Sequence, residues 1–507
     1  MFLDLQPGSL TEPLGGRSWD PRAMRAEVAR RVDSYRAHGL RRGDRVLLLF
    51  GNRLEFFAEL LALWELGACA VPVDGRLTAF EVGHLARAAA ARFAVVDGET
   101  APGVSGLTVL PTSREAPGPR PGAQGHRRAR LDDEALILFT SGSTGAPKGV
   151  LHTQRTLRAR WIALGQSLGL AAYRRTLCLL PTHFGHGLIC NCLYPWLSGQ
   201  DLFVLPPFKA DLAMRLGSIV DEHGISFLSS VPAVWQLALR TAEPPRRGTL
   251  ERVHVGSAPL SAGLWGRIQE WAGTREVFNA YGITETASWV AGTTGEPVVP
   301  EDGLVGPPWG AVIKILSTRE TDRPLAPDME CARGQPGYVW LNTPALMRGY
   351  LDRDDLTDAV VRDGWFMTGD IGILDDRGRL FLRGRERDEI NKGGLKVFPA
   401  DIEAVVERCA GVRDVCAFGF ADRLYGENIG LAVVLESADP GSARALYDWM
   451  RRHLAEHKMP VRWHVLEEIP RTSRWKVNRA EVMRACLEAT PYDLAATLGD
   501  RPAEPAP

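Results

Sequence analysis

The sequence has few of the features that would mark a membrane protein, a nucleic-acid-binding protein or a secreted protein. Its 507 residues carry 60 Lys and Arg against 61 Asp and Glu, so nothing in the charge attracts nucleic acid or an anionic lipid surface. No apolar run is long enough to cross a membrane, and the first residues lack the basic and apolar regions of a secretion signal. The eight cysteines are scattered, without the spacing of a zinc site or a disulfide framework. We therefore expect a cytoplasmic protein.

The composition that remains is that of a large globular enzyme. Apolar residues make up 45% and charged residues 24% of the chain, both ordinary values. Strand-like segments such as 44–50 alternate with helix-like segments such as 53–66, which predicts parallel sheets covered by helices. We expect an α/β N-terminal domain over 1–385, which includes a β-rich subdomain over about 304–385. A small, mobile α+β domain is expected over 386–490, and a disordered tail over 491–507.

The segment Phe139–Val150, Phe-Thr-Ser-Gly-Ser-Thr-Gly-Ala-Pro-Lys-Gly-Val, follows an apolar strand candidate. Its glycines allow backbone N–H groups to converge on an anion, and its hydroxyl groups and lysine add donors and charge, which predicts a phosphate cradle. The spacing differs from the Walker pattern. The alternative, a solvated Gly/Ser connection, is disfavoured because Pro-Lys-Gly closes onto an apolar residue. The expected phosphate-binding residues are Thr140, Ser141, Gly142, Ser143, Thr144, Gly145 and Lys148.

The segment Asn279–Glu285, Asn-Ala-Tyr-Gly-Ile-Thr-Glu, predicts a nucleotide contact. Tyr281 offers a flat face to a nucleobase, and Asn279 offers an amide to a base edge. The carboxylate of Glu285 suits Mg²⁺ whose remaining ligands are phosphate oxygens. The alternative is an ordinary turn with an exposed glutamate.

The segment 139–150 resembles, nearly residue for residue, the signature loop of the adenylate-forming superfamily. That superfamily contains acyl-CoA synthetases, adenylation domains of peptide synthetases, and luciferases. The resemblance extends through five motifs from about residue 40 to 479. It implies that Tyr281 stacks on adenine and that Glu285, with Thr144, binds Mg²⁺. It also implies ATP and CoA as further cofactors.

The later motifs resemble the family's ribose, hinge, thiol and lysine elements. Asp370 follows a Thr-Gly turn and is expected on the ribose hydroxyls, with Arg385 against ribose and phosphate. Arg387 stands at the hinge pivot, where relatives usually carry Asp or Lys. In the resemblance, Lys476 binds the carboxylate and the α-phosphate, although Trp475 precedes it where relatives usually have Gly. Two adjacent glycines, Gly393 and Gly394, are expected to line the channel for the thiol.

The segment Leu180–Leu188 corresponds to the loop that borders the acyl site in relatives. Phe184 takes the aromatic position, with His183 and His186 beside it. Amino-acid-activating relatives carry Asp at the position of Gly185, and a buried ammonium without a carboxylate is costly. We therefore expect an aryl, alicyclic or fatty acid. The acyl site is expected to comprise His183, Phe184, Gly185, Val231, Gly256, Gly282 and Ile283. The nucleotide site is expected to include Gly256, Ser257, Ala258, Pro259, Ala280, Gly282 and Thr284.

The leading interpretation is an enzyme that joins a small-molecule carboxylic acid to CoA, using ATP and Mg²⁺. A second hypothesis is a free-standing adenylation enzyme that loads a carrier protein or forms an amide. The third is a non-catalytic adenylate-binding regulator, which is disfavoured because Lys148, Glu285 and Lys476 are all present.

Overall fold

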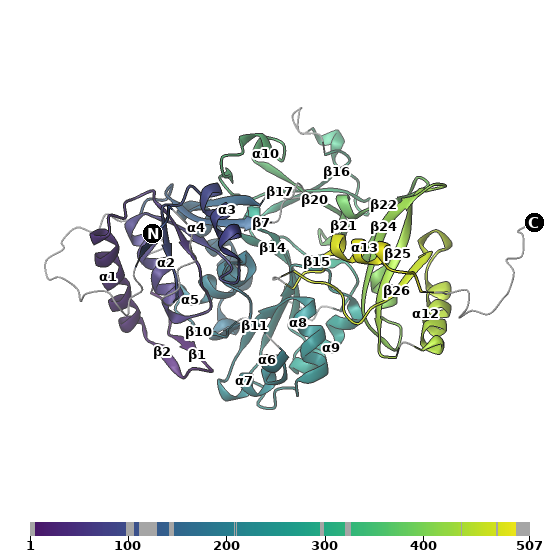
Figure 1. Ribbon diagram of the computed structural model, residues 1–507, viewed down its shortest axis with the longest axis horizontal. Helices are drawn as coiled ribbons and strands as arrows, with labels where there is room; N and C mark the ends of the chain where they lie inside the picture. The colour runs from purple at the N-terminus through teal and green to yellow at the C-terminus, as the bar shows by residue number, and fades with distance from the viewer. Residues whose placement is uncertain are drawn as a thin grey trace, which may run out of the picture.

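The computed structural model describes residues 6–97, 106–110, 129–140, 147–206, 208, 210–294, 299–319, 326–437, 439–472 and 475–492. Within them the chain forms four sheets arranged along the long axis of the molecule (Figure 1). The N-terminal helices lie at one end, and the sheet of the last hundred residues lies at the other. The predicted tail falls almost entirely outside the described residues.

Two large α/β sheets form the N-terminal part. The first runs β14-β13-β12-β11-β9-β10-β1-β2, with parallel pairing from β13 to β1. Its strands are β1 (Leu10–Glu12), β2 (Arg17–Trp19), β9 (Arg175–Cys178), β10 (Asp201–Val204), β11 (Phe227–Ser230), β12 (Arg252–Gly256), β13 (Val277–Ile283) and β14 (Ser288–Gly292). The second runs β18-β8-β7-β4-β3-β5-β6, parallel from β7 to β6. Its strands are β3 (Arg45–Leu48), β4 (Cys69–Pro72), β5 (Phe93–Val95), β6 (Thr108–Leu110), β7 (Glu134–Thr140), β8 (Lys148–Thr153) and β18 (Gly349–Tyr350). The α/β prediction is confirmed.

The central helix α2 (Leu54–Leu66) explains how the two sheets share one core. It is apolar on almost every side, and ten of its thirteen residues are buried, as expected for a helix enclosed between layers. The same apolar cluster contains Val46 of β3 in one sheet and Leu202 of β10 in the other. The helix ends at Gly67, whose φ of 71° is the left-handed conformation that closes helices.

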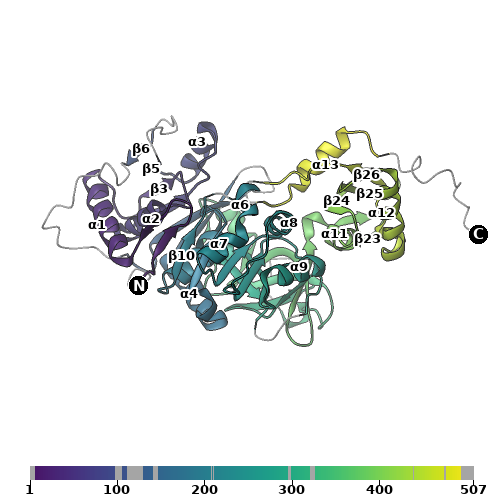
Figure 2. The same cartoon turned by 90° about the horizontal axis from the view of Figure 1, so that it is seen from below.

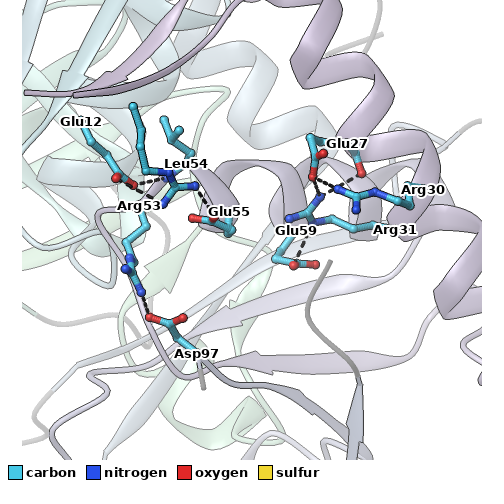
Figure 3. Close-up of polar contacts among 10 residues, drawn as sticks. Glu12, Glu27, Arg30, Arg31, Arg53, Leu54, Glu55, Glu59 and Asp97 are labelled. Atoms are coloured by element: carbon cyan, nitrogen blue, oxygen red, sulfur yellow. Dashed lines mark hydrogen bonds and ion pairs between the residues drawn. The ribbon is translucent and has the colours of Figure 1, made fainter. Parts of the chain in front are cut away.

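Helix α1 (Pro21–Ala37) packs against α2 through a buried polar cluster, shown in Figure 3. Arg31 Nε lies 2.8 Å from Glu59 Oε1, and both side chains are almost fully buried. Burial raises the pKa of Glu59 despite this arginine. At the N-terminal end of α2, Glu12 of β1 accepts the backbone N–H of Leu54 at 3.0 Å. Glu12 thus supplies the cap that Arg53, at the N-cap position, does not provide.

The remaining helices of the N-terminal part cover these sheets and lie in the connections between their strands. They are α3 (Ala79–Ala88), α4 (Gln154–Leu168), α5 (Tyr194–Trp196), α6 (Ala210–Met214), α7 (Leu216–Glu222), α8 (Pro232–Thr241) and α9 (Ala262–Ala272), with a π-helix, η3 (His186–Leu193).

The third sheet is antiparallel and runs β15-β21-β20-β17-β16, with β19 beside β20. Its strands are β15 (Leu304–Gly306), β16 (Val312–Leu316), β17 (Gly337–Asn342), β19 (Val361–Arg362), β20 (Trp365–Leu374) and β21 (Leu380–Arg385); α10 (Asp354–Asp358) lies beside them. Strand β18 is the exception in this stretch, because it pairs with β8 of the second α/β sheet.

The fourth sheet lies after residue 385 and forms an α+β unit with its helices, as predicted. It runs β23-β22-β25-β24, with β26 parallel to β25. Its elements are β22 (Ile390–Lys392), β23 (Leu395–Val397), β24 (Val412–Asp422), β25 (Gly426–Leu435), β26 (Arg462–Val465), α11 (Pro399–Val406), α12 (Pro440–His453) and α13 (Arg479–Glu488). Figure 2 shows this unit set apart at one end of the molecule, and the segment before α13 reaches back towards the centre.

Candidate active site

The turn that carries Glu285 has a strained backbone. It is the short helix η4 (Thr284–Thr286), between β13 and β14. The two residues that follow it, Ala287 and Ser288, have φ values of +53° and +76°, which non-glycine residues rarely adopt. Such a conformation persists only where surrounding contacts impose it.

Two buried side chains impose the conformation of this turn. His152 of β8 donates from Nε2 to the carbonyl of Thr284 at 2.8 Å. Arg160 of α4 donates from Nε and Nη2 to the carbonyl of Thr286 at 3.2 and 3.1 Å. Both side chains are 0% exposed. Burial lowers the pKa of His152 to about 4, so the imidazole is neutral at neutral pH.

Arg160 is a buried cation whose hydrogen-bond acceptors are neutral. Besides Thr286 it donates to the carbonyl of Trp309 at 2.9 Å and to Thr343 Oγ1 at 3.3 Å. None of the carboxylates in the described ranges forms an ion pair with it. Burial lowers the pKa of Arg160 to about 10, so it stays charged at neutral pH. It therefore ties together three segments that are distant in sequence.

Lys148 and Glu285 are linked through Tyr350. The Lys148 Nζ lies 5.1 Å from the centre of the Tyr350 ring, and Tyr350 Oη donates to Glu285 Oε1 at 2.7 Å. Burial and the Glu285 carboxylate raise the pKa of Tyr350, so its hydroxyl remains a donor. Thr140, paired in register with Lys148, ends the preceding strand. The predicted cradle residues Ser141, Gly142, Ser143, Thr144 and Gly145 lie outside the described residues.

Tyr281, Asp370 and Arg385 form a second connected group. Tyr281 Oη donates to Asp370 Oδ2, and Arg385 Nε lies 2.7 Å from Asp370 Oδ1. Asp370 and Arg385 face each other in register on β20 and β21. Asp370 is 5% exposed and Tyr281 8%, whereas the Arg385 side chain is 40% exposed. The structure thus brings together three residues that the sequence predicted in separate motifs.

The predicted acyl loop leads into the π-helix η3, which begins at His186. His186 Nε2 lies 2.6 Å from Ser229 Oγ, and Nδ1 lies 2.9 Å from Ser257 Oγ. Burial, followed by the nearby Lys476, lowers the pKa of His186 to about 3. His183 is directed instead towards Asp74, with Nε2 3.8 Å from Oδ2.

Lys476 reaches the same place from the C-terminal unit. Its Nζ lies 5.6 Å from the centre of the Phe184 ring. Lys476 is carried on a turn in which the N–H of Thr472 donates to the Lys476 carbonyl at 2.8 Å. The predicted lysine and the predicted acyl-site aromatic residue, separated by almost three hundred positions, are therefore neighbours.

The other predicted residues have varied surroundings. Asn279 donates from Nδ2 to the carbonyl of Leu304 at 2.6 Å, so its amide supports β15, and its contact with a base remains a prediction. Added Cβ atoms at Gly256 and Gly282 would approach backbone oxygens to 2.3 and 2.1 Å, so no side chain fits there. Val231 is buried at the start of α8. Of the other predicted positions, Ser257, Ala258 and Pro259 follow β12, Ala280 and Ile283 belong to β13, and Thr284 begins η4.

The predicted hinge and thiol residues lie on the C-terminal side of β21. Arg387 is exposed within η6 (Glu386–Asp388). Gly393 and Gly394 form the exposed turn between β22 and β23, with φ values of +60° and +90°. The N–H of Gly393 donates to the Tyr425 carbonyl at 2.8 Å. Their roles in hinge motion and thiol binding remain predictions.

The sequence did not reveal His152, Arg160 or Tyr350. His152 and Arg160 donate to backbone carbonyls 132 and 126 positions away, and no side-chain motif marks such an acceptor. In the part of the chain that the structure describes, no helix is long and apolar enough to cross a membrane.

Comparison with known proteins identifies the family. The AMP-binding enzyme family matches residues 16–351, and the AMP-binding enzyme C-terminal domain matches residues 401–476. The 2-succinylbenzoate–CoA ligase of Geobacillus kaustophilus is 30% identical over 88% of this chain and 89% of its own length. The feruloyl-CoA synthase of an Amycolatopsis species is 29% identical, covering 93% and 94%. ATP-bound MatB from Rhodopseudomonas palustris has a TM-score of 0.81 at 25% identity, covering 95% and 96%. The chain therefore belongs to the AMP-binding enzyme family of the adenylate-forming superfamily and is an acyl-CoA synthetase.

Proposed function

We propose that this acyl-CoA synthetase adenylates an aryl, alicyclic or fatty acid, with no ammonium group on the acid, and transfers the acyl group to CoA. The main support is the position of Lys476 beside Phe184, a residue of the proposed acyl site. From this position the ammonium group of Lys476 can contact both the carboxylate of the acid and the α-phosphate of ATP. The named substrates of the relatives, 2-succinylbenzoate and ferulate, are non-amino-acid carboxylic acids joined to CoA.

In the first step a carboxylate oxygen attacks the α-phosphorus of ATP, and the bond to the bridging oxygen of pyrophosphate breaks. The chain contributes mainly positioning and charge neutralisation. Lys476 holds the two reacting groups, and Lys148 binds the departing phosphates. Asp370 and Arg385 bind the ribose, and Tyr281 contacts adenine. In the second step the CoA sulfur attacks the acyl carbonyl, the thiol loses its proton, and AMP leaves.

Mg²⁺ fits the surroundings of Glu285. Tyr350 occupies one carboxylate oxygen, and a single carboxylate with substrate phosphates is a common way to hold this ion. Glu285 and Thr144 would bind it, and the ion would neutralise phosphate charge. The two buried donors hold the carbonyls on either side of Glu285, which supports a fixed position for this residue.

The groups around Phe184 support this acid class. His186 is buried and neutral. An added Cβ at Gly185 would meet the Leu138 side chain at 3.2 Å, so this position faces apolar surroundings. The carboxylate of Asp74, near His183, already accepts two hydrogen bonds from Arg76, at 2.9 and 2.8 Å. An ammonium group would therefore be poorly paired, whereas an apolar acid would bury favourable surface.

We expect that acid-dependent exchange between pyrophosphate and ATP, measured over a panel of aryl, alicyclic, fatty and amino acids, will identify the substrate class. Amino acids should give background exchange only, and accepted acids should form thioesters with CoA and release AMP. Phe184→Ala should shift the acid profile towards bulkier acids or lower turnover. Robust exchange with a free α-amino acid, or a profile unchanged by Phe184→Ala, would contradict the assignment. The matched control, Phe203→Ala, removes an aromatic ring from β10 instead.

We further propose that residues 1–385 act as the ATP- and acid-binding domain, and that residues 386–490 rotate about Arg387 between the two steps. The orientation seen here, with Lys476 at Phe184, suits the first step. Rotation would withdraw Lys476 and bring Gly393 and Gly394 towards the thiol. Full activity with a carrier protein in place of CoA would contradict the proposed acceptor.

A further inference from the structure

Trp475 has a backbone conformation that is unfavourable for a bulky residue. Its φ is +61°, in the left-handed region that glycine enters freely and large side chains rarely adopt. Strain of this kind persists only where the contacts of the residue compensate for it. The surroundings of the Trp475 side chain should therefore show what it does.

The Trp475 ring packs against the N-terminal part of the protein. It meets Phe208, in the segment after β10, edge to face, with ring centres 6.2 Å apart and planes at 73°. Phe208 is buried in the apolar cluster that also contains Phe184, and Trp475 packs against that cluster. The contact thus joins a residue of the C-terminal unit to the apolar core beside the proposed acyl site.

The turn that holds Trp475 also holds Lys476. The N–H of Trp475 donates to the Thr472 carbonyl at 2.9 Å, and the N–H of Thr472 donates to the Lys476 carbonyl at 2.8 Å. At the start of the turn, Arg471 Nη2 donates to Gln236 Oε1 of α8 at 3.2 Å. Arg471, Trp475 and Lys476 therefore touch the N-terminal part at Gln236, Phe208 and Phe184, respectively. Trp475 supplies the large apolar contact among the three.

We propose that Trp475 is a positioning residue: its packing on Phe208 holds Lys476 at the acid and favours adenylation over thioester formation. This inference rests on the proposed function of Lys476. When the C-terminal unit rotates, the Trp475 ring must leave Phe208, so the contact stabilises the first orientation and opposes the second. Trp475 acts through Lys476 and does not itself touch the reacting atoms.

The decisive variant is Trp475→Gly. Glycine accepts a φ of +61° without strain, so the turn is kept and only the ring is lost. An edge-to-face aromatic contact of ordinary strength corresponds to a roughly two- to tenfold change in an equilibrium. Acid-dependent pyrophosphate exchange should therefore fall about two- to tenfold. Thioester formation from supplied acyl-AMP and CoA should stay equal or rise.

Three further variants test the contact from both sides. Phe208→Leu keeps apolar volume but removes the ring that Trp475 meets, so it should change the two steps in the same way. The double variant should then be no worse than either single variant, within about twofold. Trp475→Phe retains an aromatic ring at the turn and should stay closer to wild type than Trp475→Gly.

The proposal is overturned if Trp475→Gly and Phe208→Leu leave exchange unchanged in an otherwise active enzyme. It is also overturned if both half-reactions fall equally, because a general structural defect would do that. A wild-type protein that shows no acid-dependent exchange with any acid would instead contradict the proposed function, together with this inference. The two failures are therefore distinguishable.

Discussion

Two residues with proposed roles in the site, Glu285 and Lys476, are held in different ways. The Glu285 turn is tied by buried donors, His152 and Arg160, within the N-terminal part. The exposed Lys476 lies on a turn that meets that part through an aromatic pair and a hydrogen bond from Arg471. Many buried contacts make one side of the site rigid, and few contacts at the surface make the other side easy to detach. The proposed use of Lys476 in only one of two steps requires this difference.

The largest effect is expected on acyl-AMP formation when the ammonium group of Lys476 is removed. Lys476→Ala should lower acyl-AMP formation by roughly two to four orders of magnitude, because a principal charge-stabilising group is lost. Thioester formation from supplied acyl-AMP should survive, since the proposal places Lys476 away from that step. Both rates are measured separately, with Lys458→Ala as a control lysine in the same unit. Equal loss in both steps would show that Lys476 is not confined to adenylation.

Arg160→Met tests the rigid side, the Glu285 turn. It removes the donor to the carbonyls of Thr286 and Trp309. Each of the two buried carbonyls left without a partner costs about 1–3 kcal/mol, so unfolding should require about 2–6 kcal/mol less free energy. In the folded protein the Glu285 turn should loosen, and the Mg²⁺ concentration needed for half-maximal exchange should rise. Urea unfolding and Mg²⁺ titration of exchange measure the two effects.

Arg160→Lys is the matched control for that variant, because it keeps the charge and part of the hydrogen bonding. It should fall between wild type and Arg160→Met in both measurements. If Arg160→Met were less stable but kept the wild-type Mg²⁺ dependence, Arg160 would support the fold without positioning Glu285.

The sequence predicted most of the fold because its periodicity and its turn residues agree. The predicted strand 44–50 contains β3, and the predicted helix 53–66 matches α2 to within one residue. The apolar run 430–435 predicts a strand, but β25 begins four residues earlier, at Gly426, because Asp422 accepts the N–H groups of Leu424 and Tyr425 in a tight turn. The predicted elements did not include α13 (Arg479–Glu488), which has only two buried residues and so a weak apolar stripe.

The site was predicted less completely, for a physical reason. Tyr281, Asp370 and Arg385 each have a chemical role that a short motif can suggest, so the sequence named all three. His152 and Arg160 act on carbonyl groups, which every residue carries, so the sequence cannot show which carbonyl is the partner. The φ of Trp475 is likewise a property of the folded turn. The sequence showed only that an unusual residue precedes Lys476.

A smaller effect is expected at Asp370, which we propose binds the ribose together with Arg385. Both residues belong to the rigid side of the site. Asp370→Ala removes an ion pair to Arg385 and an acceptor for Tyr281. Loss of charge-assisted hydrogen bonds to the ribose should weaken ATP binding by roughly ten- to a hundredfold. Isothermal titration measures the affinity, and circular dichroism checks the fold. A folded variant with wild-type ATP affinity would refute the ribose assignment. Asp375→Ala, in a β-turn away from this group, is the control.

The smallest expected effect concerns pH, at the contact between the two parts. Glu407, at the end of α11, lies beside Ser261, which caps α9. Burial raises the pKa of Glu407 to about 7 from an ordinary value of 4.5. Between these two values the folded protein holds a proton that the unfolded chain has released. The stabilisation from the protonated acid is therefore complete below about pH 4.5 and is lost as the pH rises to about 7.

Glu407→Gln should remove this part of the pH dependence, because an amide stays neutral. We expect the wild type to lose on the order of 1 kcal/mol more stability than the variant between pH 5 and pH 7.5, given the partial exposure of the site. Thermal unfolding across that range measures the difference, with Glu436→Gln as an exposed control in the same unit. Parallel pH profiles for wild type and Glu407→Gln would show that Glu407 is ionised in the folded protein. The contacts that hold the C-terminal unit against the N-terminal part would then be independent of pH between 5 and 7.5.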